Sequence, residues 1–89
     1  PVPPELAIEI ISPGQTFGEM AGKAEDYLNA GVSRVWVIDI EDRSISIFYP
    51  GVLLKTYRGE ELITDSLFEG LEFTVEMVFQ KAKIPNKND

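Results

Sequence analysis

The sequence predicts an α/β fold, in which a strand–helix–strand unit precedes an antiparallel β meander and a short C-terminal helix. Three segments lead to this prediction: an apolar strand at residues 5–11, a helical pattern at 17–30 and a second apolar strand at 35–40. Two strands joined through a helix by short loops are typical of a parallel βαβ unit. The length of 89 residues predicts a single domain over 1–89 with a modest core.

The first predicted strand, residues 5–11, is apolar apart from two glutamates. The two-residue period of a strand places Leu6, Ile8 and Ile10 on one face, which we expect to be core, and Glu5 and Glu9 on the opposite, mixed face. Burying a carboxylate costs several kcal/mol unless a cation or hydrogen-bond donors meet it. Glu9 therefore lies either at a solvent-facing rim of the sheet or next to a cationic partner.

The predicted helix over residues 17–30 has recognisable ends and one apolar face. Thr16 and Glu19 form a capping-box pattern at its start, and Gly31 stands where a left-handed cap belongs. The apolar face consists of Phe17, Met20, Ala21, Ala24, Tyr27 and Leu28. Lys23 lies at the margin of this face, and it either pairs with Glu19 one turn earlier or reaches the first strand and faces Glu9.

The second half of the chain reads as a meander. Residues 35–40 suit a strand covered on both sides, and the alternation at 44–49 predicts its hairpin partner. A short strand at 53–57 and an extended piece at 62–64 follow. A short helix at 75–81 should turn Val75, Val78 and Phe79 inward, and residues 83–89 are expected to form a flexible tail.

Composition excludes several kinds of chemistry. The chain has no cysteine and no histidine, so thiolate sites and histidine bases are excluded, and any bound metal should be a hard ion such as Mg²⁺ or Mn²⁺. A net charge of −7 weighs against diffuse binding to nucleic acid. No apolar run is long enough to span a membrane, and the absence of a signal-peptide pattern predicts a cytoplasmic location.

Two further carboxylates are doubtful site residues. Glu5 shares a face with Glu9, but four strand residues separate them by about 13 Å, too far to ligate one ion together. Asp39 ends the second parallel strand at the edge of the sheet where ligands often bind. A turn-forming role before residues 41–42 explains Asp39 at least as well.

Several linked motifs stand between Pro4 and Asp39, and the resemblance that they carry covers most of the chain, from Pro4 to about Phe79. They are PELAIEIISP at residues 4–13, Lys23, DYL at 26–28, GV at 31–32 and VWVID at 35–39. Together they resemble the Uma-two family of restriction endonucleases, a branch of the PD-(D/E)XK nuclease superfamily. The resemblance implies a restriction-endonuclease-like mixed sheet, of which this chain would be the C-terminal portion.

The resemblance also implies a divalent-metal site acting on DNA. Glu9 matches the acid that holds Mg²⁺ (or Mn²⁺), and Lys23 matches the catalytic lysine. That lysine usually stands two residues after the acid, where this chain has Ile11, and in this branch it looks relocated to the following helix. Glu5 stands where the family more usually has an aspartate, and we assign it no metal-binding role.

Family members look like this chain preceded by a further stretch that supplies a first metal-binding aspartate. The metal site is therefore expected to be incomplete within these residues, and the chain to be a fragment or a shortened member. Two hypotheses follow. The chain is a nuclease-like domain completed by an upstream segment or another subunit, or it is a non-catalytic remnant that serves as an oligomerisation or protein-interaction module. Unpaired sheet edges predict a homo-oligomer in either case.

Overall fold

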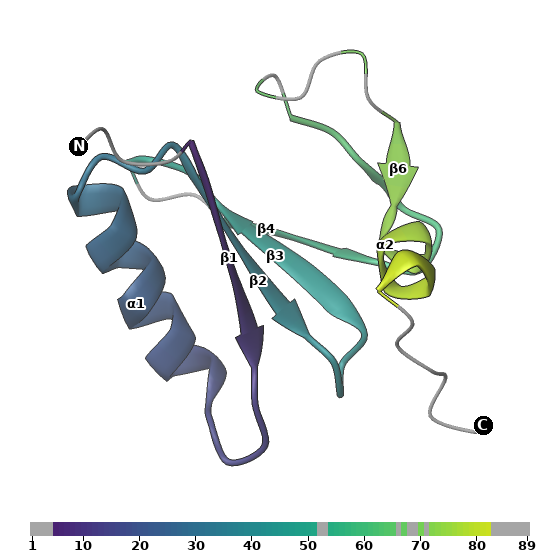
Figure 1. The fold of residues 1–89 in the computed structure, drawn as a ribbon, viewed down its shortest axis with the longest axis horizontal. Helices are drawn as coiled ribbons and strands as arrows, with labels where there is room; N and C mark the ends of the chain where they lie inside the picture. Colours follow the sequence, from purple (N-terminus) through teal and green to yellow (C-terminus); the bar gives the residue numbers. More distant parts are fainter. Residues whose placement is uncertain (1–4, 52–53, 66, 68–69, 71, 83–89) are drawn as a thin grey trace.

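The computed structural model describes residues 5–51, 54–65, 67, 70 and 72–82. Its elements in chain order are β1 (Leu6–Ile11), α1 (Phe17–Asn29), β2 (Arg34–Asp39), β3 (Ser44–Phe48), β4 (Leu54–Arg58), β5 (Leu62–Ile63), β6 (Phe73–Thr74) and α2 (Val75–Lys81) (Figure 1). The bounds of β1, α1 and β2 lie within one residue of the predicted ones. The predicted tail at 83–89 lies outside the described residues.

A four-stranded mixed sheet in the order β1-β2-β3-β4 forms the centre of the molecule. β1 runs parallel to β2, while β2–β3 and β3–β4 are antiparallel, which confirms the βαβ unit and the hairpin that follows it. The prediction for the piece at 62–64 was wrong in part. β5 does not continue the meander but pairs with β6 in a separate two-stranded sheet. This position lets Ile63 of β5 be buried in the same cluster as Phe79 of α2.

Local chemistry explains where α1 begins and ends. The hydroxyl of Thr16 accepts a hydrogen bond from the backbone N–H of Glu19, which satisfies one of the unpaired donors of the first turn. Gly31 follows the last turn with φ of 103°, a left-handed conformation that glycine adopts without the Cβ clash of other residues. Both predicted caps are confirmed, and they set the two ends of α1.

Two apolar clusters hold helices on opposite sides of the sheet (Figure 1). On one side, Ala24 of α1 packs with Val32 and Val35. On the other side, β5, β6 and α2 cover the sheet through the larger cluster of Trp36, Ile38, Ile45, Ile47, Tyr57, Ile63, Val75 and Phe79. The predicted inward face of the C-terminal helix is confirmed, since Val75 and Phe79 are buried and Val78 packs against them.

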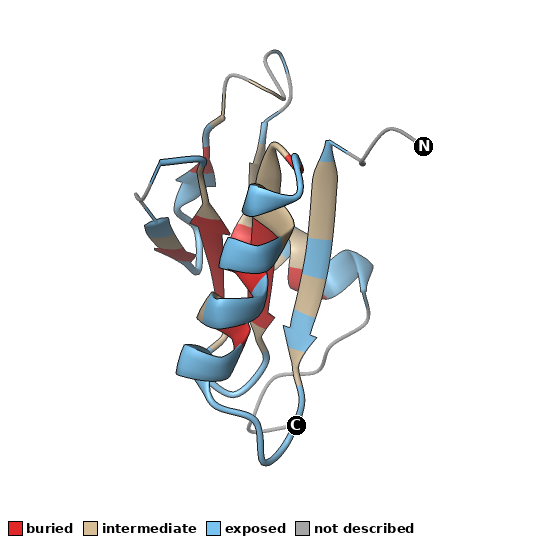
Figure 2. Cartoon of the chain, turned by 90° about the vertical axis from the view of Figure 1, so that its left-hand side faces the viewer, coloured by how far each residue is buried: buried red, intermediate tan, exposed pale blue. Residues whose placement is uncertain are grey.

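The predicted core face of β1 is largely exposed, which corrects the expectation from its apolar pattern. Leu6 packs against the larger cluster, but the side chains of Ile8 and Ile10 are 52% and 49% exposed. The layer formed by β5, β6 and α2 lies over β2, β3 and β4 and leaves most of β1 uncovered. In Figure 2, β1 accordingly alternates between intermediate and exposed residues beside the buried strands.

Candidate functional site

Glu9 lies in the middle of β1, on the side of the sheet that α1 covers. Its neighbour in the parallel register is Val37 of β2, and Ala7, two residues earlier on the same face, packs against the α1 cluster. The side chain of Glu9 is 19% exposed. The carboxylate is therefore half-buried between the edge strand and the helix, and it needs polar partners there.

Two side chains of α1 provide these partners. The Nζ atom of Lys23 lies 3.6 Å from Oε1 of Glu9, and the hydroxyl of Tyr27 donates a hydrogen bond of 2.6 Å to the same oxygen. Lys23 and Tyr27 are four residues apart, which places them on one helix face. We call Glu9, Lys23 and Tyr27 the Glu9 cluster.

The electrostatics of the cluster centre on the negative charge of Glu9. The pKa of Tyr27 is raised above 10.0, chiefly because its hydroxyl donates to Glu9 and secondly because ionisation would place two negative charges together. Lys23 is 53% exposed, so water screens its attraction to the carboxylate. The sequence offered Glu9 and Glu19 as alternative partners of Lys23. Among the described residues, Lys23 forms an ion pair with Glu9 and none with Glu19.

The two oxygens of Glu9 differ in their partners. Both protein partners engage Oε1, and no hydrogen bond within the described residues engages Oε2. The described part of the chain contains no group of three or more acidic side chains arranged to hold a metal ion. Mg²⁺ is commonly held by one or two carboxylates, with water and phosphate oxygens completing its coordination. Glu9 thus fits as one ligand of such an ion.

The two doubtful carboxylates lie apart from this cluster. Glu5 is exposed and immediately precedes β1, about 13 Å along the strand from Glu9. Asp39 pairs in register with Ile11, not with Glu9. The Oδ1 atom of Asp39 accepts a hydrogen bond from the backbone N–H of Asp42, so Asp39 has a turn-forming contact whatever else it does. The structure brings Glu9 and Lys23 together, and their catalytic role stays a prediction.

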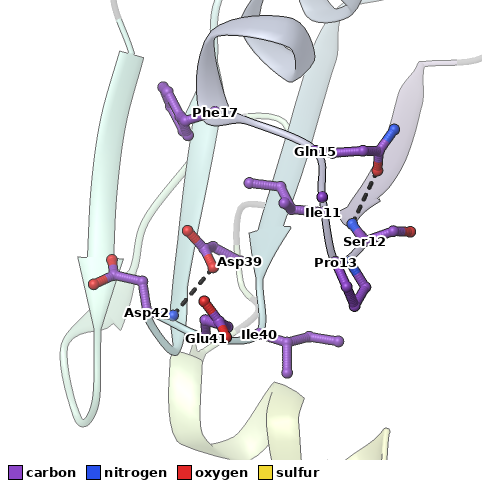
Figure 3. A pocket seen from close by; sticks show the side chains of 10 residues that line it. Ile11, Ser12, Pro13, Gln15, Phe17, Asp39, Ile40, Glu41 and Asp42 are labelled. Carbon is purple, nitrogen blue, oxygen red and sulfur yellow. Dashed lines mark hydrogen bonds between the residues drawn. The ribbon is translucent and has the colours of Figure 1, made fainter.

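A cavity of about 590 Å³ opens at the carboxyl ends of β1 and β2 (Figure 3). Its lining residues come from the β1–α1 loop, the β2–β3 turn and the adjoining ends of β1, α1 and β2. They are Ile11, Ser12, Pro13, Gly14, Gln15, Phe17, Asp39, Ile40, Glu41 and Asp42. Asp42 also pairs with exposed Arg58 at 2.6 Å. Neither Glu9 nor Lys23 lines this cavity, so the cavity and the Glu9 cluster are different places.

Sequence reasoning did not single out Tyr27 as a member of the cluster. Helical periodicity placed it in the apolar stripe of α1, and its ring does pack beside Ala24 and Val35. Its hydroxyl, however, reaches a residue 18 positions away. The available signal was the spacing of Lys23 and Tyr27, which puts two potential donors on the helix face that covers a strand carrying a carboxylate.

Comparisons with known proteins bear on the fold and the family. The family model Uma2, described as "Putative restriction endonuclease", matches residues 1–76. No curated protein matches. Among solved structures, the chain is similar to "a putative nuclease belonging to DUF820 from Anabaena variabilis ATCC 29413", with a TM-score of 0.74 and 21% identity. The likeness covers 89% of this chain and 45% of that one, so this chain spans less than half the length of its neighbour. The similarity confirms the predicted restriction-endonuclease-like α/β fold.

Proposed function

This chain belongs to the Uma2 family, and we propose that it forms part of an endonuclease that uses Mg²⁺ or Mn²⁺ to hydrolyse phosphodiester bonds of DNA. One observation carries the proposal: a half-buried strand carboxylate, Glu9, has a helix lysine, Lys23, 3.6 Å away, and its second oxygen has no hydrogen-bond partner among the described residues. The family resemblance in the sequence also implies that this pair is the acid and the lysine of the site. A nuclease-like domain is what the family and the fold support, and the metal and the site residues are our proposal.

The two residues have distinct roles in this proposal. Glu9 would hold the ion, and Lys23 and Tyr27 contact its Oε1 atom. A bound Mg²⁺ or Mn²⁺ supplies Lewis-acid activation of the phosphate and of a water molecule. Lys23 is half-exposed on a flexible stem, so its ammonium can orient the attacking water or offset negative charge that develops on the phosphate.

The site uses ligands beyond the described residues. Glu9 is the one carboxylate of the Glu9 cluster, and a single carboxylate leaves most of the octahedral coordination of Mg²⁺ to other oxygen ligands. We propose that a second acidic residue comes from a preceding segment of a longer protein or from another subunit. The net charge of −7 also implies that basic groups elsewhere help to bind the phosphate backbone.

Nicking of supercoiled plasmid tests the proposal. The protein expressed from its whole gene is assayed with Mg²⁺, with Mn²⁺ and with chelator, as wild type, Glu9→Gln and Lys23→Met. Glu19→Gln and Lys81→Met serve as matched controls, because they remove the same charges from exposed helix positions. We expect metal-dependent nicking that Glu9→Gln and Lys23→Met lower by at least about 100-fold and the controls leave unchanged. Activity that survives both site substitutions would contradict the assignment.

A second candidate function, oligomerisation without catalysis, is favoured by the exposed face of β1. Ile8 and Ile10 are about half exposed beside a strand that pairs on one side only within the described sheet, and unpaired apolar edges promote self-association. A second copy of the chain is the proposed partner. Sedimentation of wild type against Ile8→Lys tests it: a dimer that dissociates on substitution supports this function, and a wild-type monomer contradicts it.

None of the helices in the described part of the chain is long and apolar enough to cross a membrane.

A further inference from the structure

We propose that Tyr27 is a positioning residue that orients the Glu9 carboxylate for metal binding. The inference rests on the proposed function, and it adds a residue whose role neither the family match nor the sequence assigns. It stands on the hydrogen bond of 2.6 Å between the Tyr27 hydroxyl and Oε1 of Glu9. Groups that hydrogen-bond to metal ligands commonly fix the orientation of those ligands and tune the affinity for the ion.

The ring of Tyr27 is well placed for this role because packing holds it. It is half-buried and lies against the cluster of Ala24, Val32 and Val35, which joins α1 to the sheet. Its hydroxyl is thereby delivered to a defined position between helix and strand. A tyrosine also has only two rotatable side-chain bonds, so little freedom remains once the ring is packed.

Lys23 cannot position Glu9 in the same way. Its ammonium is 3.6 Å from Oε1, and the side chain is 53% exposed on a stem of four rotatable bonds. An exposed pair of this kind is weak and moves readily. A carboxylate is planar, so fixing Oε1 through the short bond from Tyr27 also restricts where Oε2 can lie. Tyr27 therefore selects the oxygen that remains for a ligand, and Lys23 is left free to act on substrate.

A purely structural role for Tyr27 makes different predictions. If the bond only fastens α1 to β1, its loss lowers the stability of the fold and leaves the metal affinity of the folded protein unchanged. If Tyr27 orients Glu9, its loss weakens metal binding in a protein that still folds. Tyr27→Phe separates these cases, because phenylalanine keeps the packed ring and removes only the hydroxyl.

The experiment measures Mn²⁺ binding by titration calorimetry on the protein expressed from its whole gene, without DNA. The variants are wild type, Tyr27→Phe, Glu9→Gln and the double substitution, with Tyr49→Phe as a matched loss of a phenol away from the Glu9 cluster. Thermal melting of each variant without metal reports the fold. We expect Tyr27→Phe to weaken Mn²⁺ binding at least about tenfold, Glu9→Gln to weaken it more, and Tyr49→Phe to leave it unchanged.

The double substitution and the metal dependence of nicking complete the test. If Tyr27 acts through Glu9, adding Tyr27→Phe to Glu9→Gln causes no further loss of affinity. In nicking assays, Tyr27→Phe should raise the Mg²⁺ concentration for half-maximal rate more than it lowers the rate at saturating Mg²⁺. Unchanged Mn²⁺ affinity in Tyr27→Phe, together with loss in Glu9→Gln, overturns this inference and leaves the proposed function intact. Mn²⁺ binding that is absent from wild type or insensitive to Glu9→Gln overturns the proposed function and this inference with it.

Discussion

Two contacts between acidic and basic side chains in this molecule have opposite characters. Arg34 at the start of β2 donates from Nε to Oδ2 of Asp65 at 2.6 Å, and their side chains are 16% and 1% exposed. Lys23 and Glu9 are 3.6 Å apart, and their side chains are 53% and 19% exposed. The first contact is short and its carboxylate is buried, whereas the second contact is longer and its lysine side chain is half exposed.

The occupancy of the carboxylate oxygens sharpens the difference. Both oxygens of Asp65 have donors, since Oδ1 accepts from the backbone N–H of Leu67, and the Arg34 guanidinium also lies 4.8 Å above the ring of Tyr49. In Glu9, both partners share one oxygen. A fully satisfied buried pair belongs to the architecture of the fold. A carboxylate that the described residues engage through one oxygen only, as they do Glu9, is a candidate for a functional site.

The largest expected effect is on stability, from Asp65→Ala. Removing one partner of a buried pair leaves the Arg34 guanidinium without its counter-charge, which typically costs about 3 to 5 kcal/mol. Urea denaturation should show this fall in the free energy of unfolding. Asp42→Ala, which breaks the exposed pair with Arg58, is the control and should cost less than about 1 kcal/mol. Equal losses in the two variants would show that the Arg34–Asp65 pair is not the closed structural contact described here.

The second effect is on function, from Glu9→Gln. The amide keeps an oxygen that can accept from Tyr27 but loses the charge with which, in the proposed function, Glu9 holds a divalent cation. Nicking should therefore fall about 100-fold, equivalent to about 2.7 kcal/mol. The free energy of unfolding should change by less than about 1 kcal/mol. The comparison of the two contacts fails if Glu9→Gln destabilises the protein as strongly as Asp65→Ala.

Sequence reasoning recovered the features that local chemistry determines. The caps of α1 depend on Thr16 and Gly31 and on residues within one turn of them, and both were predicted. The parallel pairing of β1 with β2 follows from the short joints of a strand–helix–strand unit. The closeness of Glu9 and Lys23 was one of two alternatives, because helix periodicity placed Lys23 at the margin of the packed face without saying which carboxylate it meets.

Features that depend on distant parts of the chain were not predicted. Arg34 and Asp65 are 31 residues apart, and no pattern in the sequence connects them. The exposure of Ile8 and Ile10 depends on how far the layer formed by β5, β6 and α2 extends, which an alternating strand pattern cannot reveal. The sequence pattern specifies which residues share a face, and the arrangement of the layers decides which faces are covered.

A third, smaller effect distinguishes a contribution of Lys23 to the stability of the fold from a role of Lys23 in nicking. Lys23→Met should change the free energy of unfolding by no more than about 0.5 kcal/mol, because an exposed ion pair at 3.6 Å contributes little. Nicking should nevertheless fall, because in the proposed function the Lys23 ammonium acts on the substrate. Urea denaturation and nicking measured on the same preparation check both statements, and a loss of stability comparable with that of Asp65→Ala would place Lys23 among the structural contacts.

The smallest effect is a shift in the pKa of a tyrosine. It tests whether the pKa values of Tyr27 and Tyr49 are raised by different causes in the two regions. Burial is the main cause that raises the pKa of Tyr49, to about 12, beside the Arg34–Asp65 pair. The Tyr27 pKa is raised chiefly by its hydrogen bond to Glu9. Titration followed by ultraviolet absorbance should therefore show that Glu9→Gln lowers the Tyr27 pKa towards 10.0 and leaves that of Tyr49 unchanged.

The raised pKa of Tyr27 also determines how its hydrogen bond to Glu9 contributes to stability at different pH values. The Tyr27 pKa is higher in the folded than in the unfolded protein, so the contribution is fully present below about pH 10 and is lost as the pH rises through the folded-state pKa. Wild type should thus lose more stability than Glu9→Gln when the pH is raised above 10. An identical alkaline profile for the two proteins would mean that Tyr27 does not bond to the charged carboxylate in solution, and the Glu9 cluster would then reduce to an exposed ion pair.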